Sequence, residues 1–169
     1  MNQSQLLPRG GTRGYAHLVE LRVPLARVWR ALTDPRLVRI WSGKEAELDV
    51  RRHGLYRFGR PGAAYREAQV DILEENRRLR LIYLPDAQLP PTDSALVDDL
   101  LLDVRRGEGM VALRVLGSGI PDSSDWDRAY MRIRTTWERN LARLKSTLEN
   151  PPRPKPSLVP VERPLRGFS

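Results

Sequence analysis

Side chains suited to acid, base or metal chemistry are few in this sequence of 169 residues. It contains two histidines, His17 and His53, and no cysteine. The lack of cysteine excludes disulfides, thiolate metal sites and cysteine nucleophiles, and the histidines form no HExxH-type motif. A G-x-S-x-G nucleophile motif is also missing. We therefore predict no metal site, no cofactor and no dedicated catalytic residue, and an enzyme would have to use Glu67 or His17 as its acid or base.

One glycine-rich segment has a formal nucleotide-binding pattern. Residues 107–112 read Gly-Glu-Gly-Met-Val-Ala and match G-x-G-x-x-A. A dinucleotide site needs a helix directly after the glycines, whereas residues 111–115 alternate between apolar and other side chains, as a strand does. We therefore reject dinucleotide binding.

The net charge of +8 raises the question of nucleic-acid binding. Residues 1–14 and 150–169 together supply +5 of this charge, so the body carries only +3. Basic tails attract polyanions through counterion release, but no aromatic residues are interleaved with these basic ones as a base-stacking platform requires. Nucleic acid is therefore an unlikely partner.

Chain organisation follows from composition. No apolar run approaches the roughly 20 residues of a membrane span, and the first residues lack the charged-then-apolar order of a signal peptide. We predict a cytoplasmic protein with a flexible tail at 1–14, one domain at 15–149 and a proline-rich basic tail at 150–169.

Hydrophobic periodicity predicts the elements of this domain. Apolar residues alternate through 15–23, which predicts a strand, and Pro24 and Pro35 suit the first turns of two short helices, with Asp34 as the cap of the second. A period of two then runs through segments separated by short turns, which predicts an antiparallel meander. We expect its last strand to end near Leu116, because Gly117, Ser118 and Gly119 follow.

Residues 121–150 predict one long helix that covers the sheet. Seven apolar residues recur at steps of three and four: Trp126, Tyr130, Ile133, Trp137, Leu141, Leu144 and Leu148. Ser124, with Asp127 three residues on, fits a capping box, and Pro151 with Pro152 ends the helix. The predicted fold is α+β: a curved antiparallel sheet of six to seven strands around a long C-terminal helix, with two short helices after the first strand.

The ordered motifs of residues 15–149 resemble the START-like, or SRPBCC, superfamily. Residues 23–35 resemble its N-terminal signature, Trp41 the tryptophan that follows, and residues 54–56 the glycine turn before the third strand. Residues 118–120 and 136–145 resemble the exit from the last strand and the final helix. The branch in question is named after the activator of the ninety-kilodalton heat-shock protein ATPase. Leu55 and Thr136 depart from it, standing where members often have glycine.

This resemblance implies a helix-grip fold in which the sheet curls around the last helix over a cavity. Members carry apolar ligands, act as cyclases or hydrolases, or serve chaperones. From the sequence pattern alone, the aromatic residues on the inner positions favour a solid core, because an aromatic stripe at helical spacing usually packs. With the resemblance included, we favour a ligand cavity.

Three hypotheses follow. The first is non-catalytic binding of a small hydrophobic or amphipathic molecule, such as a lipid, with Arg57 or Arg66 orienting its polar end and the loop 85–93 as a lid. The second is an interaction module for a chaperone or another protein, as in a stress-response co-chaperone. The third is a cyclase or hydrolase using the same cavity. The residues expected to line the cavity are Trp41, Tyr56, Phe58, Tyr83, Leu102, Leu113, Tyr130, Ile133 and Trp137.

Overall fold

A single antiparallel sheet and three helices make up the part of the chain that the structure describes. The computed structural model describes residues 10–62, 65–105 and 109–151. Its seven strands lie in the order β1-β7-β6-β5-β4-β3-β2, and each pairs with its neighbours in an antiparallel register. The strands are β1 (Thr12–Leu21), β2 (Glu45–Leu48), β3 (Leu55–Gly59), β4 (Arg66–Glu74), β5 (Arg78–Tyr83), β6 (Val97–Arg105) and β7 (Met110–Pro121). The helices are α1 (Leu25–Thr33), α2 (Pro35–Ser42) and α3 (Asp127–Glu149).

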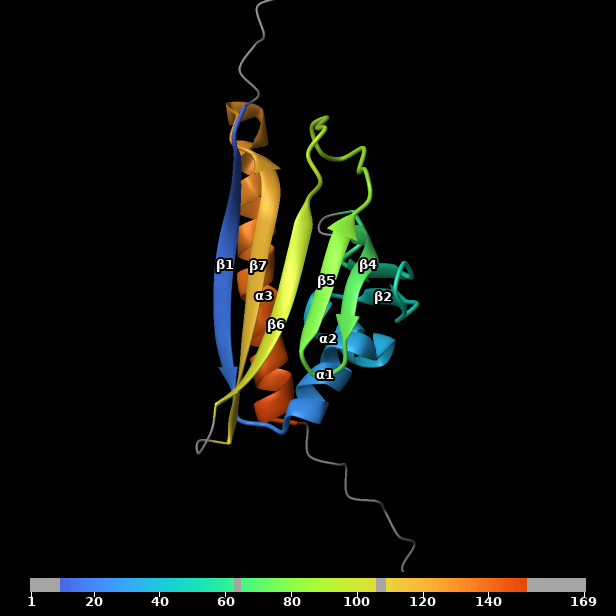
Figure 1. Ribbon diagram of the computed structural model, residues 1–169, viewed down its shortest axis with the longest axis vertical. Coiled ribbons are helices and arrows are strands. Elements are labelled where there is room, and N and C mark those ends of the chain that lie inside the picture. Colours follow the sequence, from blue (N-terminus) through green and yellow to red (C-terminus); the bar gives the residue numbers. More distant parts are fainter. Residues whose placement is uncertain (1–9, 63–64, 106–108, 152–169) are drawn as a thin grey trace, which may run out of the picture.

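The long helix α3 covers one face of the curved sheet, as the sequence predicts. Figure 1 shows α3 running behind β1, β7 and β6, with α1 and α2 at one end. The buried side of α3 consists of Ala129, Ile133, Trp137, Asn140, Leu141, Leu144 and Leu148. These residues recur at helical spacing and therefore form one stripe facing the strands. The helix-grip architecture expected from the resemblance is confirmed.

Local signals explain the two short helices. Asp34 precedes α2, and its Oδ1 accepts a hydrogen bond from the backbone N–H of Arg36 at 2.9 Å. Pro35 occupies the first position of α2, where its missing N–H costs nothing. Gly43 follows the helix with a φ of 136°, a conformation that favours glycine. The predicted cap, start and end of α2 are confirmed.

The start of α3 differs from the sequence prediction. A short 3₁₀ turn, η1 (Ser124–Trp126), precedes the helix, and no side chain caps α3. The predicted capping box at Ser124 is therefore wrong. Trp126 is only 2% exposed in this turn, so burial of its indole ring, rather than a cap, fixes the approach to the helix.

The last strand is also longer than predicted. Instead of ending near Leu116, β7 continues through Gly117 to Pro121. Gly117 is opposite Tyr15 of β1 in the ladder, and a Cβ on Gly117 would lie 2.2 Å from the Cζ of Tyr15. The glycine makes room for an aromatic ring and does not end the strand.

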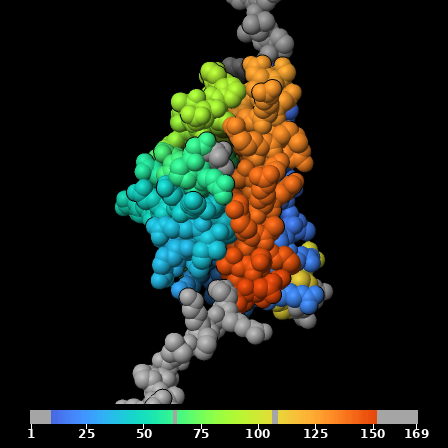
Figure 2. Space-filling view, turned by 180° about the vertical axis from the view of Figure 1, so that it is seen from behind, coloured from blue at the N-terminus to red at the C-terminus, as the bar shows by residue number. Residues whose placement is uncertain are grey.

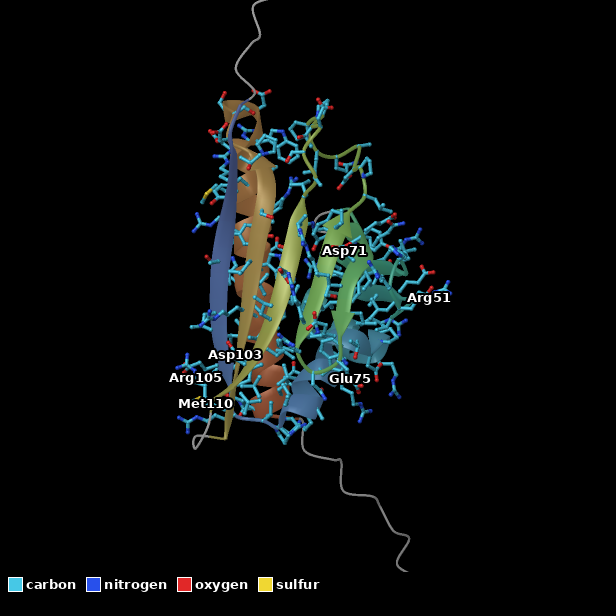
Figure 3. All side chains as sticks on the ribbon, in the orientation of Figure 1. Arg51, Asp71, Glu75, Asp103, Arg105 and Met110 are labelled. Carbon is cyan, nitrogen blue, oxygen red and sulfur yellow. The ribbon has the colours of Figure 1, made fainter. Side chains whose placement is uncertain are left out.

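The face of the sheet turned away from α3 is charged. Figure 3 shows polar side chains spread over this face and over the turns, including the labelled Asp71 and Asp103. Asp71 lies 3.7 Å from Arg80, and Arg105 lies 3.3 Å from Glu20. Such exposed pairs contribute little stability, and they leave this side of the sheet in water.

The described chain begins close to the predicted domain boundary. Strand β1 starts at Thr12, three residues before the expected start at Tyr15. Of the two predicted tails, residues 1–9 and 152–169 lie outside the described residues.

Candidate functional site

A buried carboxylate, Asp98 on β6, is the centre of the interior. Its exposure is 0%, and four side chains donate hydrogen bonds to it. The Tyr15 hydroxyl donates to Oδ1. Oδ2 accepts from the Tyr83 hydroxyl at 2.6 Å, the Trp137 Nε1–H at 3.0 Å and the Arg66 guanidinium at 3.1 Å. Because a buried carboxylate is costly without partners, these four donors are what allow it to remain there.

The sheet register brings Tyr15 to this carboxylate. Gly117 of β7 pairs with Tyr15 on one side and with Asp98 on the other. Since Gly117 has no side chain, the Tyr15 ring lies across β7 and its hydroxyl reaches Asp98 on the next strand. A glycine in the middle of a strand therefore connects β1 to β6.

Protonation suits these residues to their roles as donors. Burial, together with the negative charge of Asp98, raises the pKa of the Tyr15 and Tyr83 hydroxyls far above the ordinary tyrosine value. Burial alone would lower the pKa of Arg66, but Asp98 and the neighbouring tyrosine oxygens outweigh it and raise that pKa above its usual range. The hydroxyls therefore stay protonated and the guanidinium stays charged at neutral pH.

Arg66 is held in a fixed position. Its Cζ lies 3.4 Å from the centre of the Tyr83 ring, a cation–π contact, and its side chain is 13% exposed. Arg66 also belongs to the wall of a pocket. The Asp98 network thus forms part of the floor of a pocket.

This pocket has a volume of about 440 Å³ and opens to solvent beside α3. Figure 2 shows segments that meet there: α3 in orange, the segment after β5 in yellow-green and the described part of the β3–β4 region in green. Its apolar wall consists of Phe58, Leu84, Pro85, Ala87, Leu89, Ile133 and Trp137. Ligand sites are commonly concave and combine apolar walls with polar groups; this pocket does so with polar side chains making up about half of its lining.

The polar side chains of the pocket differ in their exposure to solvent. Asn140 is 1% exposed and Arg66 is nearly buried, whereas Arg132 and Asp86 are exposed and the Glu67 side chain is 40% exposed. The inner groups include hydrogen-bond donors, and the acids lie nearer the rim.

Three of the predicted cavity residues, Phe58, Ile133 and Trp137, line this pocket. A fourth, Tyr83, lies beneath it in the Asp98 network. The rings of Phe58 and Trp137 are 5.9 Å apart, so these two side chains also pack on each other.

The other predicted residues lie elsewhere. Trp41 and Tyr56 are each 1% exposed and pack around Phe58 in the core. Leu102 and Leu113 are buried on the inner side of β6 and β7. Tyr130 is half-buried farther along α3, where its hydroxyl donates to the Gly14 carbonyl at 2.6 Å.

The charged and histidine side chains that the sequence suggested for ligand orientation or catalysis lie in different places. Arg57 is not part of the pocket wall and pairs with Glu47 at 3.1 Å. Glu67 lines the pocket, and its carboxylate lies 3.5 Å from Arg57. His17 lies on β1 outside the pocket lining, and its buried Nε2 has no hydrogen-bond partner among the described residues.

Among residues 10–62, 65–105 and 109–151, no group of three or more His, Cys, Asp or Glu side chains is placed to hold a metal ion. The helices within these ranges include none that is long and apolar enough to cross a membrane.

Sequence reasoning missed Asp98 and Asn140. Asp98 shares its strand phase with Leu96, Leu100 and Leu102, which are all buried. An aspartate at a strand position whose neighbours on the same side are all apolar indicates a buried carboxylate, and a buried carboxylate requires hydrogen-bond partners. Asn140 falls on the buried stripe of α3 in the same way, three residues after Trp137.

Comparison with solved structures supports the fold. A protein from Mesorhizobium loti matches with a TM-score of 0.70 at 21% identity, over 83% of this chain and 99% of that one. The Aha1 dimer from Colwellia psychrerythraea matches with a TM-score of 0.68 at 17% identity, over 82% and 97%. An HSP90 activator from Plasmodium falciparum gives 0.65 at 14% identity, over 80% and 95%. At these identities the likeness concerns the fold alone.

Comparison with curated proteins found no match. The sequence model of one family, described as "Activator of Hsp90 ATPase homolog 1-like protein", matches residues 22–149. That range begins directly after β1 and ends with α3, so it includes the other six strands, the pocket and Asp98. The chain therefore belongs to the activator of Hsp90 ATPase homolog 1-like family.

Proposed function

We propose that this protein binds a small hydrophobic or amphipathic molecule, without catalysis, in the pocket beside α3, and that it does so in the cytoplasm. The observation that carries this proposal is the pocket itself, which joins an apolar wall to nearly buried polar groups. Its volume of about 440 Å³ lies in the range of small-molecule sites.

The wall opposite α3 supports the same proposal. Residues 84–89 form it, and a turn stabilises them, since the Leu89 N–H donates to the Asp86 carbonyl at 3.1 Å. Leu84 and Leu89 are half-buried while the residues between them are exposed. We propose that this loop, which contains Pro85, acts as the lid over a bound molecule.

The test uses Nile red, an uncharged hydrophobic dye, titrated into the purified full chain. Saturable binding is expected, and Thr136→Phe should weaken it by at least about ten-fold, because Thr136 is half-buried in the pocket wall and a phenyl ring would occupy the space. Ala142→Phe is the matched control, since it places the same ring on the exposed side of the same helix. Absence of saturable binding, or equal effects of the two variants, would contradict the proposal.

A second candidate function is binding of a partner protein, and a surface on α3 favours it. Four exposed arginines, Arg128, Arg132, Arg139 and Arg143, lie within one narrow sector of the helix and extend over about 22 Å, at about 1.5 Å per residue. We call them the arginine stripe. No ion pair connects any of them to an acid within the described residues.

The arginine stripe destabilises α3, and binding of a partner protein would offset this loss. Arg128 with Arg132, and Arg139 with Arg143, are like charges four residues apart, and each such pair destabilises a helix by about 0.2–0.5 kcal/mol. An acidic face on a partner protein is complementary to this stripe. Family membership makes a ninety-kilodalton heat-shock chaperone the first partner to try.

Surface plasmon resonance with a purified chaperone of that class, at two salt concentrations, tests this candidate. Arg139→Glu should weaken binding by about ten-fold and reduce its salt dependence. Arg114→Glu, on the opposite face of the molecule, should leave it unchanged. Binding of a random DNA duplex in place of the chaperone would contradict the protein-partner hypothesis.

A further inference from the structure

The polar groups of the pocket are arranged so that donors face its inner end. Arg66 and Asn140 are the most buried of them, whereas Asp86 is exposed at the rim and the Glu67 side chain is 40% exposed. A molecule that enters with its polar end first would therefore meet hydrogen-bond donors at the inner end and leave the acids behind at the rim. The placement of donors at the inner end and acids at the rim determines which polar group of a ligand fits the pocket.

Arg66 is oriented before any ligand arrives. Stacking on the Tyr83 ring at 3.4 Å fixes the plane of its guanidinium, and one hydrogen bond of 3.1 Å joins it to Asp98. A guanidinium carries several N–H donors in a rigid fork. Asp98 takes three further hydrogen bonds, from Tyr15, Tyr83 and Trp137. The carboxylate therefore does not depend on Arg66 alone, and Arg66, which lines the pocket, has N–H groups beyond the one that bonds to Asp98.

Asn140 lines the same pocket, and its amide oxygen already has a partner. The Oδ1 of Asn140 accepts a hydrogen bond from Arg143 at 3.1 Å. With the amide oxygen engaged there, the NH₂ group is the part of this side chain left to serve the pocket that Asn140 lines. Arg132, exposed at the rim, adds a positive charge on the same helix.

We propose, resting on the ligand-binding function proposed above, that the pocket takes an amphipathic monocarboxylate. Its carboxylate is turned toward Arg66 and Asn140, and its apolar chain or ring lies against Phe58, Ile133 and Trp137. A carboxylate supplies two coplanar acceptor oxygens, which match the guanidinium fork, and charge-assisted bonds of this kind are stronger than neutral ones. A cationic end has no acceptor oxygen for the N–H groups of Arg66 and Asn140, and it would meet Arg132 as a like charge.

Three probes with the same ten-carbon chain test the proposal on the full chain: decanoate, decanol and decyltrimethylammonium, titrated calorimetrically. Decanoate should bind at least about ten-fold more tightly than decanol, and decyltrimethylammonium should bind most weakly. Equal affinity for decanoate and decanol, or preference for the cation, would overturn the carboxylate assignment and leave the pocket function standing. Binding of none of the three would remove the pocket function itself.

Asn140→Asp gives the sharper test, because it replaces the NH₂ group by a charged oxygen of the same size and keeps an acceptor for Arg143. It should weaken decanoate by at least about ten-fold and leave decanol unchanged. Ala142→Asp adds the same charge to the exposed side of α3 and should change neither affinity. Thr136→Asp places a carboxylate in the pocket wall from a half-buried position and serves as a second variant should Asn140→Asp unfold. Unchanged decanoate binding in a folded pocket variant would overturn the proposal.

Discussion

Two sets of buried tryptophan and tyrosine side chains hold the interior together, and they satisfy their polar atoms in different ways. In the first set, Trp41 donates its Nε1–H to the Ala31 carbonyl at 2.7 Å, and the Tyr56 hydroxyl donates to the Leu32 carbonyl at 2.6 Å. Each donor has its own neutral acceptor at the end of α1. Loss of one bond in this aromatic cluster leaves the other intact.

The second set shares a single acceptor. Tyr15, Tyr83, Trp137 and Arg66 all donate to Asp98, from four different elements. These contacts join β1, β4, β5 and α3 to β6, over sequence separations of up to 83 residues. The same residue types therefore form local anchors in one region and an interdependent network in the other, where one substitution affects every member.

Removal of the shared acceptor should have the largest effect. Asp98→Leu leaves the Arg66 guanidinium buried without its counter-charge, and loss of one partner of a buried pair costs about 3–5 kcal/mol. Urea unfolding followed by fluorescence and circular dichroism measures the change in free energy of unfolding. Asp99→Asn is the matched control: its carboxylate points to the outer face and pairs with the more exposed Arg78 at 2.7 Å, so it should cost no more than about 1 kcal/mol. Similar losses for the two variants would contradict the network.

Much of this fold is readable from the sequence, because its elements obey local rules. Alternation gives the strands, Asp34 and Pro35 give the start of α2, and the stripe that includes Ile133 and Leu144 gives α3. Each of these signals lies within a few residues of the element it defines. The end of β7, which the sequence placed five residues too early, depends at Gly117 on a partner 102 residues away, the Tyr15 ring.

The site is less predictable for the same physical reason. Phe58, Ile133 and Trp137 were identified because aromatic and apolar side chains at inner positions have a local signature. Asp98 has no local partner, since Tyr83 is its nearest donor in sequence and lies 15 residues away. The choice between Arg57 and Arg66 likewise depends on strand register, which alternation alone leaves open.

Substitution of one tyrosine in each region should have unequal effects on stability. Tyr83→Phe removes a donor to a buried charge and should cost about 1.5–3 kcal/mol, whereas Tyr56→Phe removes a donor to the neutral Leu32 carbonyl and should cost about 1 kcal/mol. Both side chains are nearly buried, and both changes delete one oxygen atom. Urea midpoints of the two variants measure the difference. A larger loss for Tyr56→Phe would reverse our assignment of the stronger acceptor.

A double-mutant cycle examines interdependence directly. Tyr15 and Tyr83 donate to the same carboxylate, so the double change to Phe should exceed the sum of the single changes by at least about 0.5 kcal/mol, because each remaining donor carries more of the charge. The pair Tyr15 and Tyr56 lies on β1 and β3, with four strands between them, and should be additive. Additivity in both cycles would mean that Asp98 does not connect its donors.

The smallest expected effect concerns His17, which lies next to Tyr15 with ring centres 5.4 Å apart. Burial and the positive charge of Arg134 lower its pKa from the ordinary value of 6.5, against the opposing charges of Glu138 and Asp98. The unfolded chain therefore binds a proton that the folded chain does not, within the window just below pH 6.5. His17 thus contributes stability that is present above pH 6.5 and is lost as the pH falls through its folded value.

Urea unfolding at pH 7.5 and pH 5.5 tests this sign with both histidines of the chain. Between these two pH values, His17→Gln should lose less stability than the unsubstituted protein, because it lacks the protonation that favours unfolding. His53→Asn is the matched control: it removes the other imidazole of the chain from an exposed turn with a φ of 66°, a conformation that asparagine tolerates. A smaller loss of stability in His17→Gln than in His53→Asn would therefore assign the effect to the His17 ring. An unchanged pH dependence in His17→Gln would mean that the ring is hydrated in the folded state, and the region around Tyr15 would then be more open than the core around Trp41.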